Sequence, residues 1–140
     1  MSLATGMERM IGKNTLRVLV IEDDYSTARI LRMCLEASGF EVSVTSLGGE
    51  ALRVLEQDPP QAVILDLGLP DGLGGSVLAW LRESQRHDTP TWMIVSALDR
   101  EEASRRYGPI GGHFTPKPFN PWDLVGTLEQ LLGARGWRPT

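Results

Sequence analysis

The stretch Ala62–Gly72 reads AVILDLGLPDG and constrains the fold more than any other part of the sequence. An unbroken apolar run, 62–65, is typical of a central parallel strand that is covered on both faces. The run ends in a carboxylate, Asp66, and a loop with glycine and proline follows. In open parallel sheets, ligands bind beyond the carboxyl ends of the strands. Asp66 is therefore a candidate functional residue, although an aspartate after a strand can also cap the next helix.

Strand-like and helix-like segments alternate along the rest of the chain. Besides the Asp66 strand, the apolar patterns predict strands over 16–21, 41–45, 91–95 and 112–115. Apolar residues spaced as on one face of a helix predict helices over about 26–38, 46–58, 73–83, 99–107 and 120–132. Ser46 is the expected N-cap of the second helix, and Asn120 followed by Pro121 begins the last. This alternation predicts a doubly wound α/β fold: a five-stranded parallel sheet with helices on both faces.

Composition excludes several classes of protein. The chain has 140 residues, and its 41% hydrophobic and 23% charged content is ordinary for a globular domain. A net charge of −4 without a basic block argues against direct binding of nucleic acid. One cysteine, Cys34, cannot form an internal disulfide, and no segment has the pattern of a membrane span or a signal peptide. We therefore expect a cytoplasmic protein that binds neither membrane nor nucleic acid.

The predicted elements also divide the chain. We expect a domain over 15–133. A polar leader over 1–14 is expected to be disordered or derived from cloning, and 134–140 to be a tail or the stub of a linker.

Polar residues of complementary charge follow four of the five predicted strands. Glu22 and Asp23 follow the first strand, Asp66 the third, Ser96 the fourth and Lys117 the fifth. The carboxyl ends of parallel strands meet at one edge, where each carboxylate pair at ~4 Å and an effective dielectric of about 20 repels by on the order of 4 kcal/mol. Such a cluster needs a cation, and carboxylate, carbonyl and water oxygens are the ligands of Mg²⁺. The set suits phosphoryl transfer to a carboxylate, in which catalysis is chiefly positioning and charge neutralisation.

Four short motifs occur in order along the chain. They are VIEDD after the first strand, VILDLGLPDG around Asp66, VSA after the fourth strand and KPF before the last helix. Together they resemble the receiver domains of two-component response regulators, over about residues 16–132. The resemblance implies a flavodoxin-like fold with strand order 2-1-3-4-5. It also implies a protein that accepts a phosphoryl group from a histidine kinase or a phosphotransfer protein and switches a surface that binds a downstream effector protein or domain.

The resemblance assigns each candidate residue a role. The acceptor would be Asp66, with Lys117 and Ser96 acting on the phosphoryl group. The Mg²⁺ ligands would be Glu22, Asp23, Asp66 and the backbone carbonyl of Gly68. The switch residues would be Ser96 and Phe114. The flanking prolines and the resemblance together predict a rigid turn with a cis peptide bond between Lys117 and Pro118.

Two segments depart from the family pattern, and two other functions remain open. Gly108–Gly112 replaces the usual segment before the fifth strand, and Pro116 lies within that strand, which an edge position tolerates. A receiver that binds partners without phosphorylation is one alternative. A haloacid-dehalogenase-like phosphatase is the other, but it needs a second aspartate where this chain has Gly68. We expect no enzyme activity beyond the protein's own phosphoryl transfer and dephosphorylation.

Overall fold

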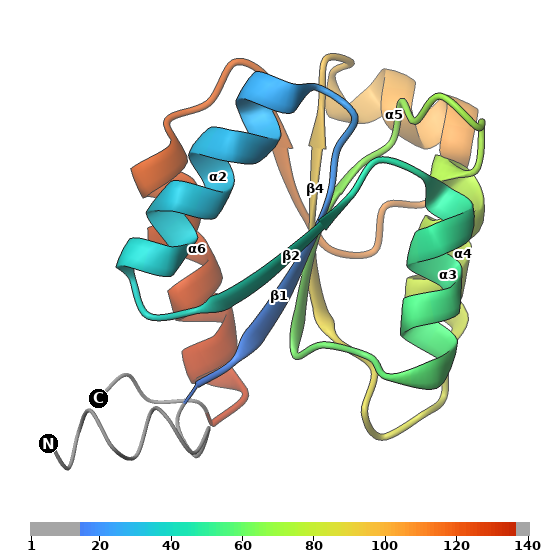
Figure 1. The fold of residues 1–140 in the computed structure, drawn as a ribbon. Coiled ribbons are helices and arrows are strands. Elements are labelled where there is room, and N and C mark those ends of the chain that lie inside the picture. Colours follow the sequence, from blue (N-terminus) through green and yellow to red (C-terminus); the bar gives the residue numbers. More distant parts are fainter. Residues whose placement is uncertain (1–14, 137–140) are drawn as a thin grey trace, which may run out of the picture.

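The computed structural model describes residues 15–136, in which strands and helices alternate (Figure 1). The strands are β1 (Arg17–Ile21), β2 (Glu41–Thr45), β3 (Ala62–Asp66), β4 (Thr91–Ser96) and β5 (His113–Pro116). The helices are α2 (Tyr25–Ala37), α3 (Gly48–Gln57), α4 (Gly74–Glu83), α5 (Arg100–Tyr107) and α6 (Pro121–Ala134). The leader over 1–14 and most of the expected tail lie outside the described residues, so both remain predictions. No helix within 15–136 is long and apolar enough to cross a membrane.

All the strands run parallel in one sheet of order β2-β1-β3-β4-β5, which confirms the predicted fold and topology. Helices α2 and α6 cover one face, and α3, α4 and α5 cover the other (Figure 1). Side chains of a strand alternate between the faces, so Val18 and Val20 pack under α2 and α6 while Leu19 and Ile21 pack under α3 and α4. Burial of both faces explains why the central strands are continuously apolar.

Most predicted boundaries hold to within two residues, and one predicted cap is wrong. Asn120 accepts hydrogen bonds from the backbone N–H groups of Trp122 and Asp123 and so caps α6 as expected. Ser46 does not cap α3: Leu47 is at the N-cap position and makes no side-chain bond there. Strand β5 extends through Pro116, which lies opposite Ser96 at the sheet edge. An edge strand has one side without a partner, and this accommodates the missing N–H of proline.

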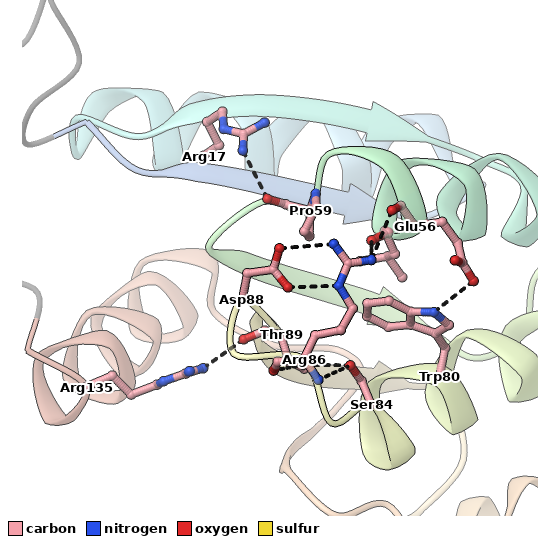
Figure 2. Close-up of polar contacts among 10 residues, drawn as sticks. Arg17, Glu56, Pro59, Trp80, Ser84, Arg86, Asp88, Thr89 and Arg135 are labelled. Carbon is pink, nitrogen blue, oxygen red and sulfur yellow. Dashed lines mark hydrogen bonds and ion pairs between the residues drawn. The ribbon is translucent and has the colours of Figure 1, made fainter.

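The amino-terminal edge of the sheet carries a network of arginine contacts (Figure 2). The guanidinium of Arg17 donates to the carbonyl of Pro59 at 3.0 Å, and that of Arg135 donates to the carbonyl of Thr89 at 3.2 Å. Arg86 donates to the carbonyl of Glu56, near the end of α3, at 2.9 Å. These bonds satisfy carbonyl groups at helix and loop ends. The network lies opposite the sheet edge where the predicted functional residues gather.

Candidate functional site

Strand β3 places Asp66 at the centre of the carboxyl edge of the sheet. All residues of β3 are buried, and the strand is paired on both sides, with β1 and with β4. Asp66 is only 8% exposed, and its Oδ1 accepts a hydrogen bond from the N–H of Gly68 at 3.1 Å. The apolar run thus forms a buried central strand, as predicted, and places the carboxylate of Asp66 at the carboxyl edge of the sheet.

Glu22 and Asp23 follow β1 and lie beside Asp66. One carboxylate oxygen from each of the three residues lies within 4.8 Å of the other two. Glu22 is 2% exposed and Asp23 is exposed to solvent, so the cluster opens outward on the side of Asp23. Oε2 of Glu22 accepts a hydrogen bond from the N–H of Asp24 at 3.1 Å. The structure therefore brings together the three acidic residues that the sequence analysis predicts as metal ligands.

Lys117 places a positive charge against two of the three acids. Its Nζ lies 2.8 Å from Oε1 of Glu22 and donates to Oδ2 of Asp66 at 3.0 Å. Its backbone N–H donates to the carbonyl of Ser96 at 2.8 Å, which ties the loop after β5 to the end of β4. The Lys117–Pro118 peptide bond is cis, as predicted.

The cluster shifts the protonation of its members. Burial raises the pKa of Glu22 from 4.5 to about 7; Lys117 opposes this rise and Asp66 adds to it. Burial by itself would lower the pKa of Lys117, but Glu22 and Asp66 outweigh it and raise that pKa. The cluster thus holds the carboxyl groups of Glu22, Asp23 and Asp66 but only the one ammonium group of Lys117. This excess of negative charge, carried by hard oxygen donors, fits Mg²⁺.

Asp24 is the cap of α2 and lies outside the three-acid cluster. It is exposed, and its Oδ2 accepts from the N–H of Thr27 at 2.9 Å and from the Thr27 hydroxyl at 2.6 Å. These bonds lower the pKa of Asp24. The geometry therefore supports capping of α2 as the role of Asp24.

Ser96 and Phe114 lie on the same face of the sheet. Ser96 ends β4 and is 3% exposed, and its hydroxyl oxygen accepts from the N–H of Leu98 at 3.0 Å. On the neighbouring strand, Phe114 pairs with Ile94, and Ile94 precedes Ser96 by two residues on β4. The Phe114 side chain is half-buried and packs against the core under α3, α4 and α5. Ser96 therefore borders the acid edge, while Phe114 lies farther back along the neighbouring strand.

The loop between β3 and α4 contains Gly68 and a residue that the sequence reasoning missed, Asp71. Its carboxylate accepts backbone N–H bonds from Gly48, Gly49 and Leu73. These bonds, that of Gly49 foremost, lower the pKa of Asp71. Asp71 thereby caps α3 from a distant loop, the role expected of Ser46. From the sequence, the Pro-Asp-Gly segment predicts only a loop. The contact of Asp71 with Gly48 joins residues that are 23 positions apart, and no local sequence pattern predicts it.

The chain is similar in sequence and in fold to known proteins. The family model of the response regulator receiver domain matches residues 18–129. The transcriptional regulatory protein KdpE of Mycobacterium tuberculosis is 49% identical over 115 residues, which cover 82% of this chain and 50% of that protein. The transcriptional regulatory protein PrrA of Mycobacterium leprae is 35% identical over 127 residues, which cover 89% and 53% respectively. The chain thus spans about half the length of these curated relatives.

A solved structure supports the same assignment. The signal receiver domain of the putative LuxO repressor protein from Vibrio parahaemolyticus aligns with a TM-score of 0.74 and 27% identity, covering 86% of this chain and 92% of that one. The family match extends from β1 into α6 and so includes every element that contributes to the acid edge. The chain therefore belongs to the response regulator receiver domain family.

Proposed function

We propose that this protein accepts a phosphoryl group on Asp66 from a histidine kinase or a phosphotransfer protein. The observation that carries the proposal is the position of Lys117, whose ammonium bridges Asp66 and Glu22 beside Asp23. An oxygen of Asp66 attacks the phosphorus of the donor phosphohistidine. The phosphorus–nitrogen bond breaks, its electron pair returns to the imidazole nitrogen, and an acylphosphate forms on Asp66.

The residues around Asp66 suit this transfer. Glu22, Asp23, Asp66 and the carbonyl of Gly68 would hold Mg²⁺, which when bound neutralises charge on the phosphoryl oxygens. Lys117 is held by its loop within hydrogen-bond distance of the acceptor and stabilises the same charge. We assign the protein no enzyme activity beyond this transfer and the later loss of its own phosphoryl group, and we propose residues 15–133 as the receiver domain.

Ser96 and Phe114 are the proposed switch. The Ser96 oxygen accepts from Leu98, which leaves its own O–H free to donate to a phosphoryl oxygen on Asp66. Movement of the hydroxyl toward the phosphate would open space near Phe114. A change of this kind would favour one arrangement of the surface formed by α5, β5 and α6. The downstream partner is an effector protein or domain that binds this arrangement.

The surface beside the site suits a protein donor. Three large apolar residues in the first two turns of α2 and α6 are exposed: Tyr25 is 76%, Ile30 47% and Trp122 56% exposed. A groove of about 430 Å³ between the start of α2 and the loop after β5 includes Ile30, Lys117 and Phe119 in its lining. Exposed apolar area beside a polar reaction site is typical of a protein interface. We place the protein in the cytoplasm with its donor, and we propose no direct contact with nucleic acid or membrane.

The experiment is phosphorylation with acetyl phosphate and Mg²⁺, followed by intact mass. The wild-type protein should gain one phosphoryl group, and Asp66→Asn should gain none. Asp24→Asn is the matched control, because it removes a neighbouring carboxylate outside the three-acid cluster and should still be labelled. Undiminished labelling of D66N would contradict the proposed acceptor. Mg²⁺ binding by a wild-type protein that gains no phosphoryl group would favour a receiver that works without phosphorylation.

A further inference from the structure

The β3–α4 loop is bonded to the first turn of α3 through Asp71. Oδ1 of Asp71 accepts from the N–H groups of Gly48 and Leu73, both at 3.2 Å, and Oδ2 accepts from the N–H of Gly49 at 3.0 Å. Helix α3 has no side-chain cap of its own at Leu47. One carboxylate therefore satisfies two free donors of the helix and one donor of its own loop.

Close backbone packing reinforces this connection at two glycines. A Cβ on Gly48 would lie 2.7 Å from Cβ of Leu73, and a Cβ on Gly74 would lie 2.0 Å from the carbonyl oxygen of Leu67. Glycine is thus required where α3 and α4 begin. The loop packs against Gly74 at Leu67, and it contacts the start of α3 through Asp71 and Leu73. Gly68 lies between these two points of contact.

We propose that Asp71 is a positioning residue for the metal site, which acts by fixing the loop that presents the carbonyl of Gly68. This inference rests on the proposed function, in which that carbonyl is a ligand of Mg²⁺. Asp71 itself does not belong to the group of acids that could hold the ion. Mg²⁺ requires near-ideal ligand geometry, so a loosened carbonyl weakens binding even when every carboxylate remains. Residues that orient ligands typically contribute about 10–100-fold to metal affinity.

Asp71→Ala tests the proposal through Mg²⁺ binding, measured by titration of the amide resonances of Asp66 and Gly68. We expect the dissociation constant for Mg²⁺ to rise about tenfold or more. In phosphorylation by acetyl phosphate, the half-saturating Mg²⁺ concentration should rise by the same factor. The rate at saturating Mg²⁺ should return to the wild-type value, because Asp66 and Lys117 are unchanged.

Arg86→Ala is the matched control, because it weakens the same helix at its other end. Arg86 donates to the carbonyl of Glu56 in the last turn of α3 (Figure 2). If Asp71 only stabilises α3, then D71A and R86A should affect Mg²⁺ binding alike. If Asp71 positions the loop, R86A should lower stability toward urea while its Mg²⁺ affinity stays at the wild-type value.

Asp71→Asn provides a second, milder variant. The amide oxygen can keep the bonds from Gly48 and Leu73 but not the bond at Oδ2, so its Mg²⁺ affinity should lie between those of wild type and D71A. If D71A fails to fold, weakened Mg²⁺ binding by folded D71N supports the proposal. Mg²⁺ affinity equal to that of the wild type in the folded variants would overturn the positioning role of Asp71 but would leave the proposed metal site intact. Absence of Mg²⁺ binding in the wild-type protein would overturn the proposed metal site and this inference together.

Discussion

The Nζ of Lys117 donates a hydrogen bond to Oδ2 of Asp66 across 3.0 Å, although the two residues are 51 positions apart in the chain. The contact joins the loop after the edge strand β5 to the end of the central strand β3. The same ammonium lies 2.8 Å from the buried carboxylate of Glu22. Lys117 therefore offsets part of the negative charge of the acid cluster and donates a hydrogen bond to the proposed acceptor.

Replacement of Lys117 by Met should change Mg²⁺ binding and phosphorylation in opposite directions. Loss of the ammonium removes a cation that competes for the oxygens of Glu22 and Asp66, so Mg²⁺ should bind more tightly. Loss of a preorganised donor should slow phosphorylation by about 10²–10³-fold. Calorimetric Mg²⁺ titration and acetyl phosphate kinetics on the same preparation measure both effects. Weaker Mg²⁺ binding by K117M would show that the lysine acts mainly by maintaining the site's structure.

The stability of the metal-free protein should depend on pH through Glu22. Its pKa is about 7 in the folded protein against 4.5 for the unfolded chain, so the folded state binds more protons between these values. The free energy of unfolding should therefore be highest below pH 4.5, as far as this group is concerned, and should fall as the pH rises through about 7. Urea denaturation with EDTA across this range measures the slope.

The Glu22→Gln variant is the control for this pH dependence. Its side chain does not titrate, so the free energy of unfolding should lose the part of the slope that belongs to Glu22. An equal slope in wild type and E22Q would assign the pH dependence to other groups.

The proposed switch should be visible as a local change in hydrogen exchange. Beryllofluoride, a mimic of the phosphoryl group, should alter exchange between Ser96 and Phe119, because the Ser96 hydroxyl turns toward Asp66 and Phe114 follows. Ser96→Ala should remove most of this change and leave Mg²⁺ binding intact, since the proposed ligands are Glu22, Asp23, Asp66 and the carbonyl of Gly68. Identical exchange in this segment with and without the mimic would rule out the switch.

Gly74→Ala should destabilise the protein, because the new Cβ would lie 2.0 Å from the carbonyl oxygen of Leu67. Forced overpacking of this kind costs about 1–3 kcal/mol, measurable by urea denaturation. Gly126→Ala is the matched control in α6, where an added Cβ meets nothing within 4 Å. There alanine should stabilise the protein by about 0.5–1 kcal/mol through helix propensity. Equal effects of the two variants would contradict the close packing at Gly74.

The order of the elements and the composition of the acid edge were predictable from the sequence. Apolar runs such as 62–65 identify central strands because both faces of those strands are covered. Polar residues in the last position of a strand or directly after it, such as Asp66 and Glu22, necessarily lie at the carboxyl edge of a parallel sheet. The topology then brings these acids together without any further information from the sequence.

Contacts between distant loops were not predictable in the same way. Ser46 has the right residue type and position to cap α3, yet Asp71 occupies that role from 22 residues beyond Gly49. A tertiary contact thus overrides a local preference. The half-buried position of Phe114 also depends on how the helices cover the sheet, which periodicity alone does not specify.

The position of the phosphoryl group tests most directly whether Asp66 is the acceptor. Borohydride reduces an aspartyl phosphate to homoserine with release of phosphate, and peptide mass spectrometry then identifies the modified position. The protein treated with acetyl phosphate and Mg²⁺ should contain homoserine at position 66 and aspartate at 23, 24 and 71. Homoserine at any of those other positions, or none at 66 in phosphorylated protein, would contradict the assignment of Asp66 as the acceptor.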